Sequence, residues 1–157
     1  MCMDKDELVR ILKEQQIAVL SNVDANNNVH GSTMFFVVDE FLNFYLLTKS
    51  NTRKHENIKS NNNVALTVIF LKEQKTVQAE GTIEEVSAGT EQYRTIISEF
   101  AVKNAEQDDI SWPPPLAKLP DAGLIIHRIT PNWLRYGDYS KYDQEVYQQV
   151  IPSELVS

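Results

Sequence analysis

The sequence has 157 residues and a formal net charge of -7, and 42% of its residues are hydrophobic. This length favours one domain over residues 1–157, the acidic charge argues against a nucleic-acid partner, and no apolar run approaches the roughly 20 residues of a membrane span. The N-terminus lacks an apolar signal-peptide core and Cys2 is the only cysteine, so we expect a cytoplasmic protein with no membrane partner.

The first part of the chain predicts one helix followed by an antiparallel meander of three strands. In the helix, Asp4 and Glu7 stand at the N-cap and N3 positions, and the apolar residues that follow share one face. Turns rich in Asn and Asp separate the strands. The expected bounds are residues 4–15 for the helix and residues 17–23, 29–38 and 43–48 for the strands.

A short helix with cations in its first turn is expected next. One of residues 50–52 would serve as its N-cap, which places Arg53 and Lys54 at the start of the helix. A helix N-terminus already carries partial positive charge, so cations there cost up to about 1 kcal/mol unless an anion is bound. We interpret this segment as a candidate phosphate site. A solvated surface helix is the alternative.

The rest of the chain predicts more strands and one more helix. Residues 64–70 are almost continuously apolar, which is typical of a strand covered on both faces, and residues 76–86 alternate apolar and polar side chains. Ser87 would cap a helix with one apolar face, and residues 112–115 would form a proline-rich surface loop. The last strands are expected at residues 124–129 and 133–136, broken at Pro131 and followed by a polar tail from about residue 140.

Together these elements predict a mainly β fold with peripheral helices, of the α+β class, arranged as a closed or split antiparallel β-barrel. The sequence offers no catalytic motif of its own. Its three histidines lack metal-ligand spacing, and there is no GxSxG, GxxxxGK[ST] or GxGxxG pattern. We therefore expect each histidine to be structural or exposed, and any chemistry to come from a cofactor.

The order of elements resembles the pyridoxamine 5′-phosphate oxidase-like family of FMN-binding split barrels, over about residues 4–139. The resemblance is carried by FYLLT at residues 44–48, TRKxxNI at 52–58, VQAEG at 77–81 and ITP at 129–131. It implies an FMN cofactor whose phosphate is held by Arg53 and Lys54. It also implies a homodimer with the cofactor at the interface.

Other cofactor contacts follow from the same resemblance. They would be Thr48 and Ser50 beside the phosphate, Ser32, Thr33 and Met34 along the isoalloxazine ring, and Trp133 and Arg135 reaching the cofactor of the partner subunit. Two positions depart from the family pattern: Phe35 or Phe36 stands where a substrate-binding Lys is expected, and Thr76 where a Gln contacts flavin. A buried phosphate needs paired positive charge, so the substrate is not expected to be pyridoxine phosphate.

The leading hypothesis is therefore an FMN-dependent oxidoreductase with an unknown small-molecule substrate or electron donor. A non-catalytic flavin-binding or electron-carrier protein is the main alternative, and only an enzyme would show turnover with NADH or NADPH. An empty barrel that serves as an interaction module is the third reading. Deazaflavin or haem in place of FMN stays open, and Trp112 in the proline-rich loop is a candidate lid.

Overall fold

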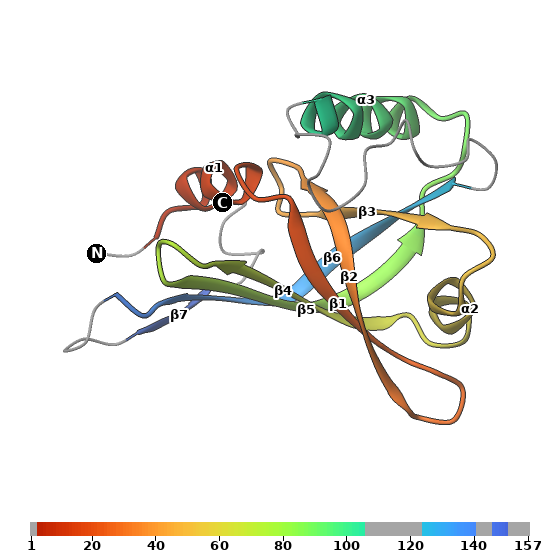
Figure 1. The fold of residues 1–157 in the computed structure, drawn as a ribbon, viewed down its shortest axis with the longest axis horizontal. Coiled ribbons are helices and arrows are strands. Elements are labelled where there is room, and N and C mark those ends of the chain that lie inside the picture. The colour runs from red at the N-terminus through yellow and green to blue at the C-terminus, as the bar shows by residue number, and fades with distance from the viewer. Residues whose placement is uncertain (1–2, 106–123, 141–145, 151–157) are drawn as a thin grey trace.

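A computed structural model describes residues 3–105, 124–140 and 146–150 (Figure 1). Cys2 and the proline-rich loop with Trp112 lie outside the described residues, so the lid stays a prediction. The elements are α1 (Lys5–Lys13), β1 (Ile17–Val23), β2 (Val29–Val38), β3 (Phe44–Lys49), α2 (Arg53–Ser60), β4 (Asn63–Phe70), β5 (Lys75–Glu85), α3 (Glu91–Ala105), β6 (Leu124–Asp138) and β7 (Tyr147–Val150).

The strands form one antiparallel sheet in the order β3-β2-β1-β4-β5-β6-β7, and an additional pairing of β3 with β6 closes it into a barrel. Six strands make the closed ring, and β7 extends β6 beyond it. This arrangement confirms the predicted antiparallel β-barrel with peripheral helices. None of the described helices is both long and apolar enough to cross a membrane.

The barrel is split along one edge of β2. This strand pairs with β1 over its first seven residues, but with β3 only over residues 36–38. Among the described strands, the β3-facing edge of residues 29–35 therefore has no partner. Figure 1 shows the β1–β2 hairpin extending past the rest of the sheet on the side where α2 lies.

The barrel interior holds the main core, and α1 covers one end of it. Leu8 and Leu12 of α1 and Ile58 of α2 belong to one buried cluster with inward-facing side chains of every barrel strand. A second apolar layer forms outside the barrel, where α3 packs against β2. Phe100 of α3 lies 5.5 Å from Phe35, measured between ring centroids. Each such buried side chain contributes roughly 1.5–3 kcal/mol.

Local signals explain the helix ends, with one difference from the sequence expectation. Asp4 is the N-cap of α1, since its Oδ1 accepts a hydrogen bond of 2.8 Å from the Asp6 N–H. Glu7 stands at N3 as expected, and its side chain forms an ion pair with Arg10. Before α3, Thr90 and not Ser87 takes the capping role, because Thr90 Oγ1 accepts from Tyr93 N–H at 3.2 Å.

The C-terminal strands differ from the expectation as well. Residues 124–138 form one continuous strand, because Pro131 sits at a register shift where the ladder tolerates a residue without an N–H. The expected polar tail contains β7, which pairs with β6 from Gly137 to Leu134. In β4, burial alternates and Ile69 is 55% exposed, so a single chain covers only one face of this strand.

Gly81 is required by the close approach at this register shift. A Cβ at Gly81 would overlap the Thr130 carbonyl oxygen and lie 2.8 Å from Pro131 Cα. We therefore expect Gly81→Ala to lower the free energy of unfolding by about 1–3 kcal/mol, because backbone must shift to make room. Chemical denaturation would measure the change.

Gly31→Ala is the matched control, since a Cβ there meets its nearest atom at 4.0 Å. The control should change stability by less than about 0.5 kcal/mol. Equal effects of the two substitutions would contradict the steric explanation.

One end of the barrel interior is polar. Asn22, Thr48 and His127 point inward there from β1, β3 and β6, and His55 and Asn57 of α2 are buried beside this end. Within the described part of the chain, each of these five side chains has at least one buried polar atom without a hydrogen-bond partner. The ring centroids of His55 and His127 lie 5.4 Å apart. Buried polar groups without partners are costly, so this end of the barrel would be stabilised by any added group that hydrogen-bonds to them.

His127 should make the stability of the protein depend on pH. Burial, with smaller contributions from His55 and Lys54, lowers its pKa from 6.5 to about 4. Between these values the unfolded chain binds a proton that the folded chain does not, so the free energy of unfolding should fall as pH decreases from 6.5 to 4. In a His127→Gln variant the stability should depend less on pH across the same window. Parallel pH profiles for the two proteins would contradict a buried neutral His127.

Candidate functional site

The N-terminus of α2 is built as the sequence predicts. Thr52 is the N-cap: its Oγ1 accepts from His55 N–H at 3.4 Å and donates to the Lys49 carbonyl at 2.9 Å. Arg53 and Lys54 are therefore the first two residues of the helix. The acid of the first turn, Glu56, lies 3.6 Å from Lys59 and not beside either cation.

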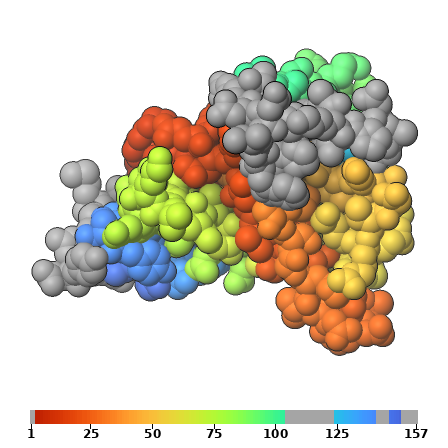
Figure 2. Space-filling model, in the orientation of Figure 1, coloured from red at the N-terminus to blue at the C-terminus, as the bar shows by residue number. Residues whose placement is uncertain are grey.

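Arg53 reaches from α2 to the β1–β2 hairpin. Its Nη2 lies 2.9 Å from Nδ1 of His30, and Nε2 of His30 lies 3.0 Å from Oδ2 of Asp24. Figure 2 shows α2 (yellow) and this hairpin (orange) side by side on one face of the molecule. His30 was not among the predicted site residues. Its only signal in the sequence is its place at the start of β2, six residues after Asp24.

Lys54 is half-buried beside the polar end of the barrel, and burial lowers the pKa of its ammonium group. Neither Arg53 nor Lys54 forms an ion pair with a described residue. Thr48, at the end of β3, is 3% exposed, and its hydroxyl has no partner among the described residues. Ser50 is exposed in the turn between β3 and α2. These donors and cations thus lie close together along the chain, between the end of β3 and the first turn of α2.

The predicted ring-binding residues lie on the open part of β2, and their side chains alternate in direction. Ser32 is half-buried, Thr33 is exposed, and Met34 is buried in the barrel core. A flat ligand at this edge would thus meet the Thr33 side chain and backbone, while Met34 would contribute only backbone.

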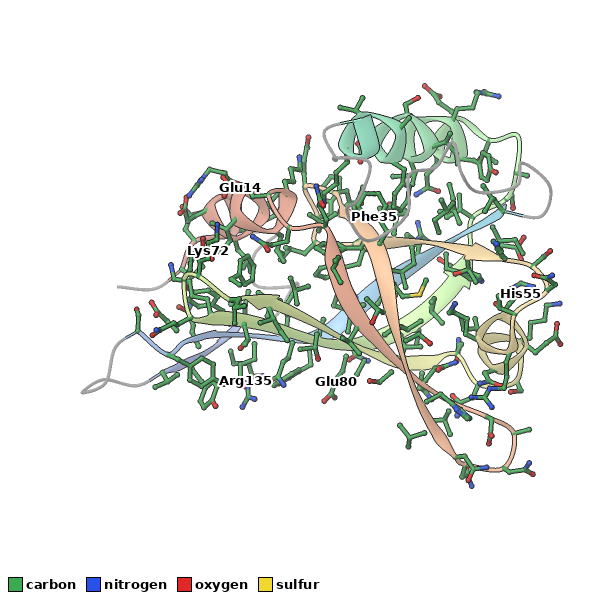
Figure 3. All side chains as sticks on the ribbon, viewed as in Figure 1. Glu14, Phe35, His55, Lys72, Glu80 and Arg135 are labelled. Atoms are coloured by element: carbon green, nitrogen blue, oxygen red, sulfur yellow. The ribbon has the colours of Figure 1, made fainter. Side chains whose placement is uncertain are left out.

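Trp133, Arg135 and Thr76 lie on another part of the sheet. Arg135 stacks 4.1 Å above the Tyr147 ring and donates from Nε to Gln78 Oε1 at 3.1 Å. Trp133 and Arg135 line a cavity of about 210 Å³ on the outer face of the sheet, whereas Thr76 lines a separate hollow. In Figure 3, Arg135 and His55 of α2 lie far apart. Within one chain, these three residues are not brought to α2.

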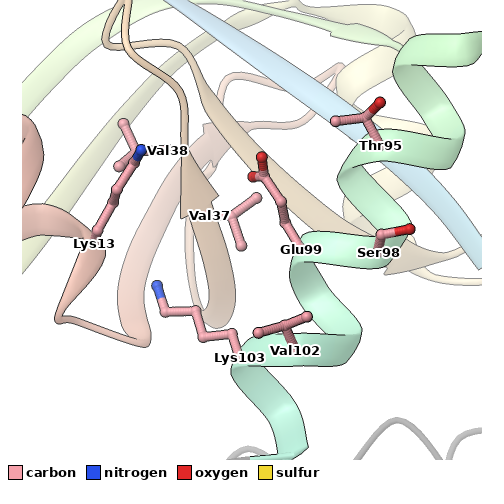
Figure 4. A pocket seen from close by; sticks show the side chains of 8 residues that line it. All are labelled: Lys13, Val37, Val38, Thr95, Ser98, Glu99, Val102 and Lys103. Atoms are coloured by element: carbon pink, nitrogen blue, oxygen red, sulfur yellow. The ribbon is translucent and has the colours of Figure 1, made fainter.

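A further hollow of about 610 Å³ lies between the end of α1, the end of β2 and α3 (Figure 4). Glu99 and Lys103 of α3 line it, and burial raises the pKa of the Glu99 carboxyl. Lys103 Nζ donates to the Phe36 carbonyl at 3.1 Å and lies 4.7 Å above the Phe36 ring. The sequence did not reveal this hollow, because it combines residues of three separate elements.

Phe35 and Phe36 are both buried. Phe35 packs under α3, and Phe36 is fully enclosed in the barrel core. The only cation that the described residues place against either ring is Lys103, which comes from α3 and not from β2. The second strand itself offers no positive charge at this point.

Comparison with solved structures shows the same fold in several proteins. A protein from Clostridium acetobutylicum related to general stress protein 26, of the pyridoxinephosphate oxidase family, has a TM-score of 0.65 at 18% identity, with 98% of this chain and 99% of the other covered. An FMN-binding protein from Nostoc punctiforme related to pyridoxamine 5′-phosphate oxidase has a TM-score of 0.60 at 13% identity, with coverages of 91% and 90%. The haem storage protein HutZ from Vibrio cholerae has a TM-score of 0.59 at 14% identity, with coverages of 95% and 97%.

A comparison with curated protein sequences finds no match. At the sequence level, the family described as pyridoxamine 5′-phosphate oxidase matches residues 4–119, which is most of the chain. This match agrees with the split barrel, with the cationic start of α2 and with the resemblance carried by residues 44–58. The chain belongs to the pyridoxamine 5′-phosphate oxidase family.

Proposed function

We propose that this protein binds FMN, with the phosphate at the N-terminus of α2, and acts as an FMN-dependent oxidoreductase. The observation that carries the proposal is the pair of cations, Arg53 and Lys54, at a helix start that holds no counter-charge among the described residues. A phosphate dianion would offset the unfavourable interaction of these cations with the helix dipole. It would also accept hydrogen bonds from the unpaired N–H groups of the first turn. The partly buried Lys54 ammonium gains most from such a partner, because burial has already removed part of its hydration.

The neighbouring groups fit the same ligand. The Thr48 hydroxyl is buried and unpaired, and the open edge of β2 leaves backbone accessible beside Ser32 and Thr33. A flat ring at this edge would be held by backbone hydrogen bonds, with its phosphate towards α2. When bound, FMN supplies the electron-transfer chemistry, and the protein binds it, orients it and excludes water.

The chain's histidines favour FMN over haem, although proteins that bind haem share the fold. Haem iron is commonly held by an axial His. Here His55 and His127 are enclosed, at 4% and 1% exposure, and both ring nitrogens of His30 are engaged by Asp24 and Arg53. No imidazole of this chain is therefore presented to a ligand on the surface.

The substrate is proposed to be something other than pyridoxine phosphate. A second phosphate group would need its own paired cations. The position where the family pattern has a Lys holds Phe35 or Phe36, and both are buried. Flavin reduction by NADH or NADPH with turnover would distinguish the oxidoreductase from an electron carrier.

We further propose a homodimer in which Trp133 and Arg135 approach the cofactor of the partner subunit. The outer face of β4 and β6 supports this arrangement, since Ile69 is exposed there and the cavity lined by Trp133 faces away from the barrel interior. A second copy would cover this face. It would also bring the two residues near an α2 that their own chain places elsewhere.

The phosphate site is tested by Arg53→Ala combined with Lys54→Ala. Each charge-assisted hydrogen bond contributes roughly 1.5–3 kcal/mol, so FMN affinity should fall about a hundredfold to ten-thousandfold if the two act independently. Fluorescence titration with FMN and with riboflavin would measure this. Riboflavin lacks the phosphate, so its affinity should change little.

Lys49→Ala with Lys59→Ala is the matched control, because it removes the same charge from the same segment outside the first turn of α2. This control should keep both the affinity for FMN and the preference over riboflavin. Tight and selective FMN binding by the Arg53 and Lys54 double variant would place the phosphate elsewhere.

Sedimentation of the FMN-loaded protein tests the dimer. We expect a two-subunit species, and we expect Trp133→Ala to weaken FMN binding without changing the fold. A monomer that binds FMN at all concentrations would contradict both the dimer and the proposed role of Trp133.

A further inference from the structure

His30 links the tip of the β1–β2 hairpin to the start of α2. Its ring accepts from Arg53 Nη2 at 2.9 Å through Nδ1 and donates to Asp24 Oδ2 at 3.0 Å through Nε2. A guanidinium only donates hydrogen bonds, so the Arg53 contact requires an unprotonated Nδ1. The hydrogen of the neutral ring then belongs on Nε2, where the Asp24 carboxylate accepts it. The two contacts therefore select one tautomer of His30.

Asp24 is itself fixed by the turn. Its Oδ1 accepts from the Asn26 and Asn28 N–H groups at 2.8 and 2.9 Å, and its Oδ2 accepts from the Asn28 side chain at 3.1 Å. The His30 hydrogen bond, followed by that of the Asn28 N–H, holds the pKa of the Asp24 carboxyl well below its usual range. The carboxylate thus stays charged, and a single turn anchors the whole chain of contacts.

We propose that Asp24 and His30 are positioning residues that hold the Arg53 guanidinium ready for the cofactor phosphate. This inference rests on the proposed function, in which Arg53 binds that phosphate. Arg has five N–H donors, and the contact with His30 uses one of them. The remaining donors stay available, so Arg53 can hold His30 and a phosphate together.

The expected gain is one of preorganisation. Arg53 is exposed and lies at the end of a long side chain, which would otherwise lose its rotamer freedom when the ligand binds. His30 lies on the open part of β2, so it restrains Arg53 on the side of the split where the ring is proposed to lie. Lys103 also contacts this hairpin, but at Phe36, near the opposite end of β2.

Two substitutions of His30 separate its two contacts. In His30→Gln the amide can still donate to Asp24, but no acceptor remains at the position of Nδ1. In His30→Asn the amide oxygen can replace Nδ1 as the acceptor for Arg53. We expect His30→Gln to lower FMN affinity about two- to tenfold, as for the loss of one hydrogen bond, and His30→Asn, which keeps an acceptor for Arg53 but loses the contact with Asp24, to retain more of the affinity than His30→Gln. Riboflavin affinity should stay the same in both variants.

A double-mutant cycle with Arg53→Ala distinguishes positioning from a structural role. In the Arg53→Ala background, His30→Gln should have no further effect on FMN affinity, because the side chain that it positions is absent. An equal loss in both backgrounds, or tighter FMN binding by His30→Gln, would overturn the inference.

The cycle also separates this inference from the proposed function. If the wild type does not bind FMN, or if Arg53→Ala binds it as tightly as the wild type, the phosphate site is wrong. If Arg53→Ala weakens binding and His30→Gln does not, the phosphate site stands and the positioning role falls.

A measurement without cofactor completes the test. Nitrogen NMR of the ligand-free protein should show the His30 ring with its hydrogen on Nε2, and Asp24→Asn should weaken this preference. A ring with its hydrogen on Nδ1 would rule out the contact with Arg53 and overturn the inference.

Discussion

The pairing of β3 with β6 is the constraint on which the rest of the structure depends. β6 pairs with β5 along most of its length, and its first part also pairs with β3. This second pairing closes the ring, whereas β3 pairs with β2 only over residues 44–46. The barrel is therefore closed between β3 and β6 and split between β2 and β3. The turn between β3 and β4 must cross the end of the barrel at this split, and α2 occupies that turn.

The placement of α2 explains how an acidic protein can present a cationic site. Arg53 and Lys54 lie at the N-terminus of a helix, which is the positive end of its dipole, and the buried polar side chains beside them are imidazoles and amides. No acid of the described segments offsets these two cations, whereas Asp24 acts on Arg53 only through His30. Two cations without an ion-pair partner among the described residues thus lie together in a chain whose net charge is -7.

Most of the fold could be predicted because short apolar runs and polar turns alternate clearly along the chain. The bounds of β1 and β2 agree with the expectation, and the cationic helix begins where its cap predicts. The continuity of β6 could not be read from the sequence, because a proline usually ends a strand. Pro131 is tolerated here because the register of the ladder between β5 and β6 shifts beside it, opposite Gly81. β7 was missed because its four residues include two glutamines and only one buried apolar side chain.

The contacts around the start of α2 were harder to predict than the helix itself. Arg53 and His30 are 23 residues apart, and their contact depends on how far the β1–β2 hairpin extends beyond the barrel. No periodicity or spacing encodes that length. The interior direction of Met34 follows from the strand register, which becomes visible only once β2 is paired with β1.

The open edge of β2 has a further consequence, for the solubility of the protein. An unpaired strand edge can template the addition of a strand from another molecule, which is a common route to aggregation. Val29 at the start of this edge is 74% exposed, but residues 30–33, which are His, Gly, Ser and Thr, are small or polar and resist such pairing better than β-branched apolar residues would. The residues proposed to face the flat ring of the cofactor are thus also those that disfavour pairing of this edge with another chain. Substitutions that add apolar surface to this edge would therefore favour self-association and leave less room for a ligand.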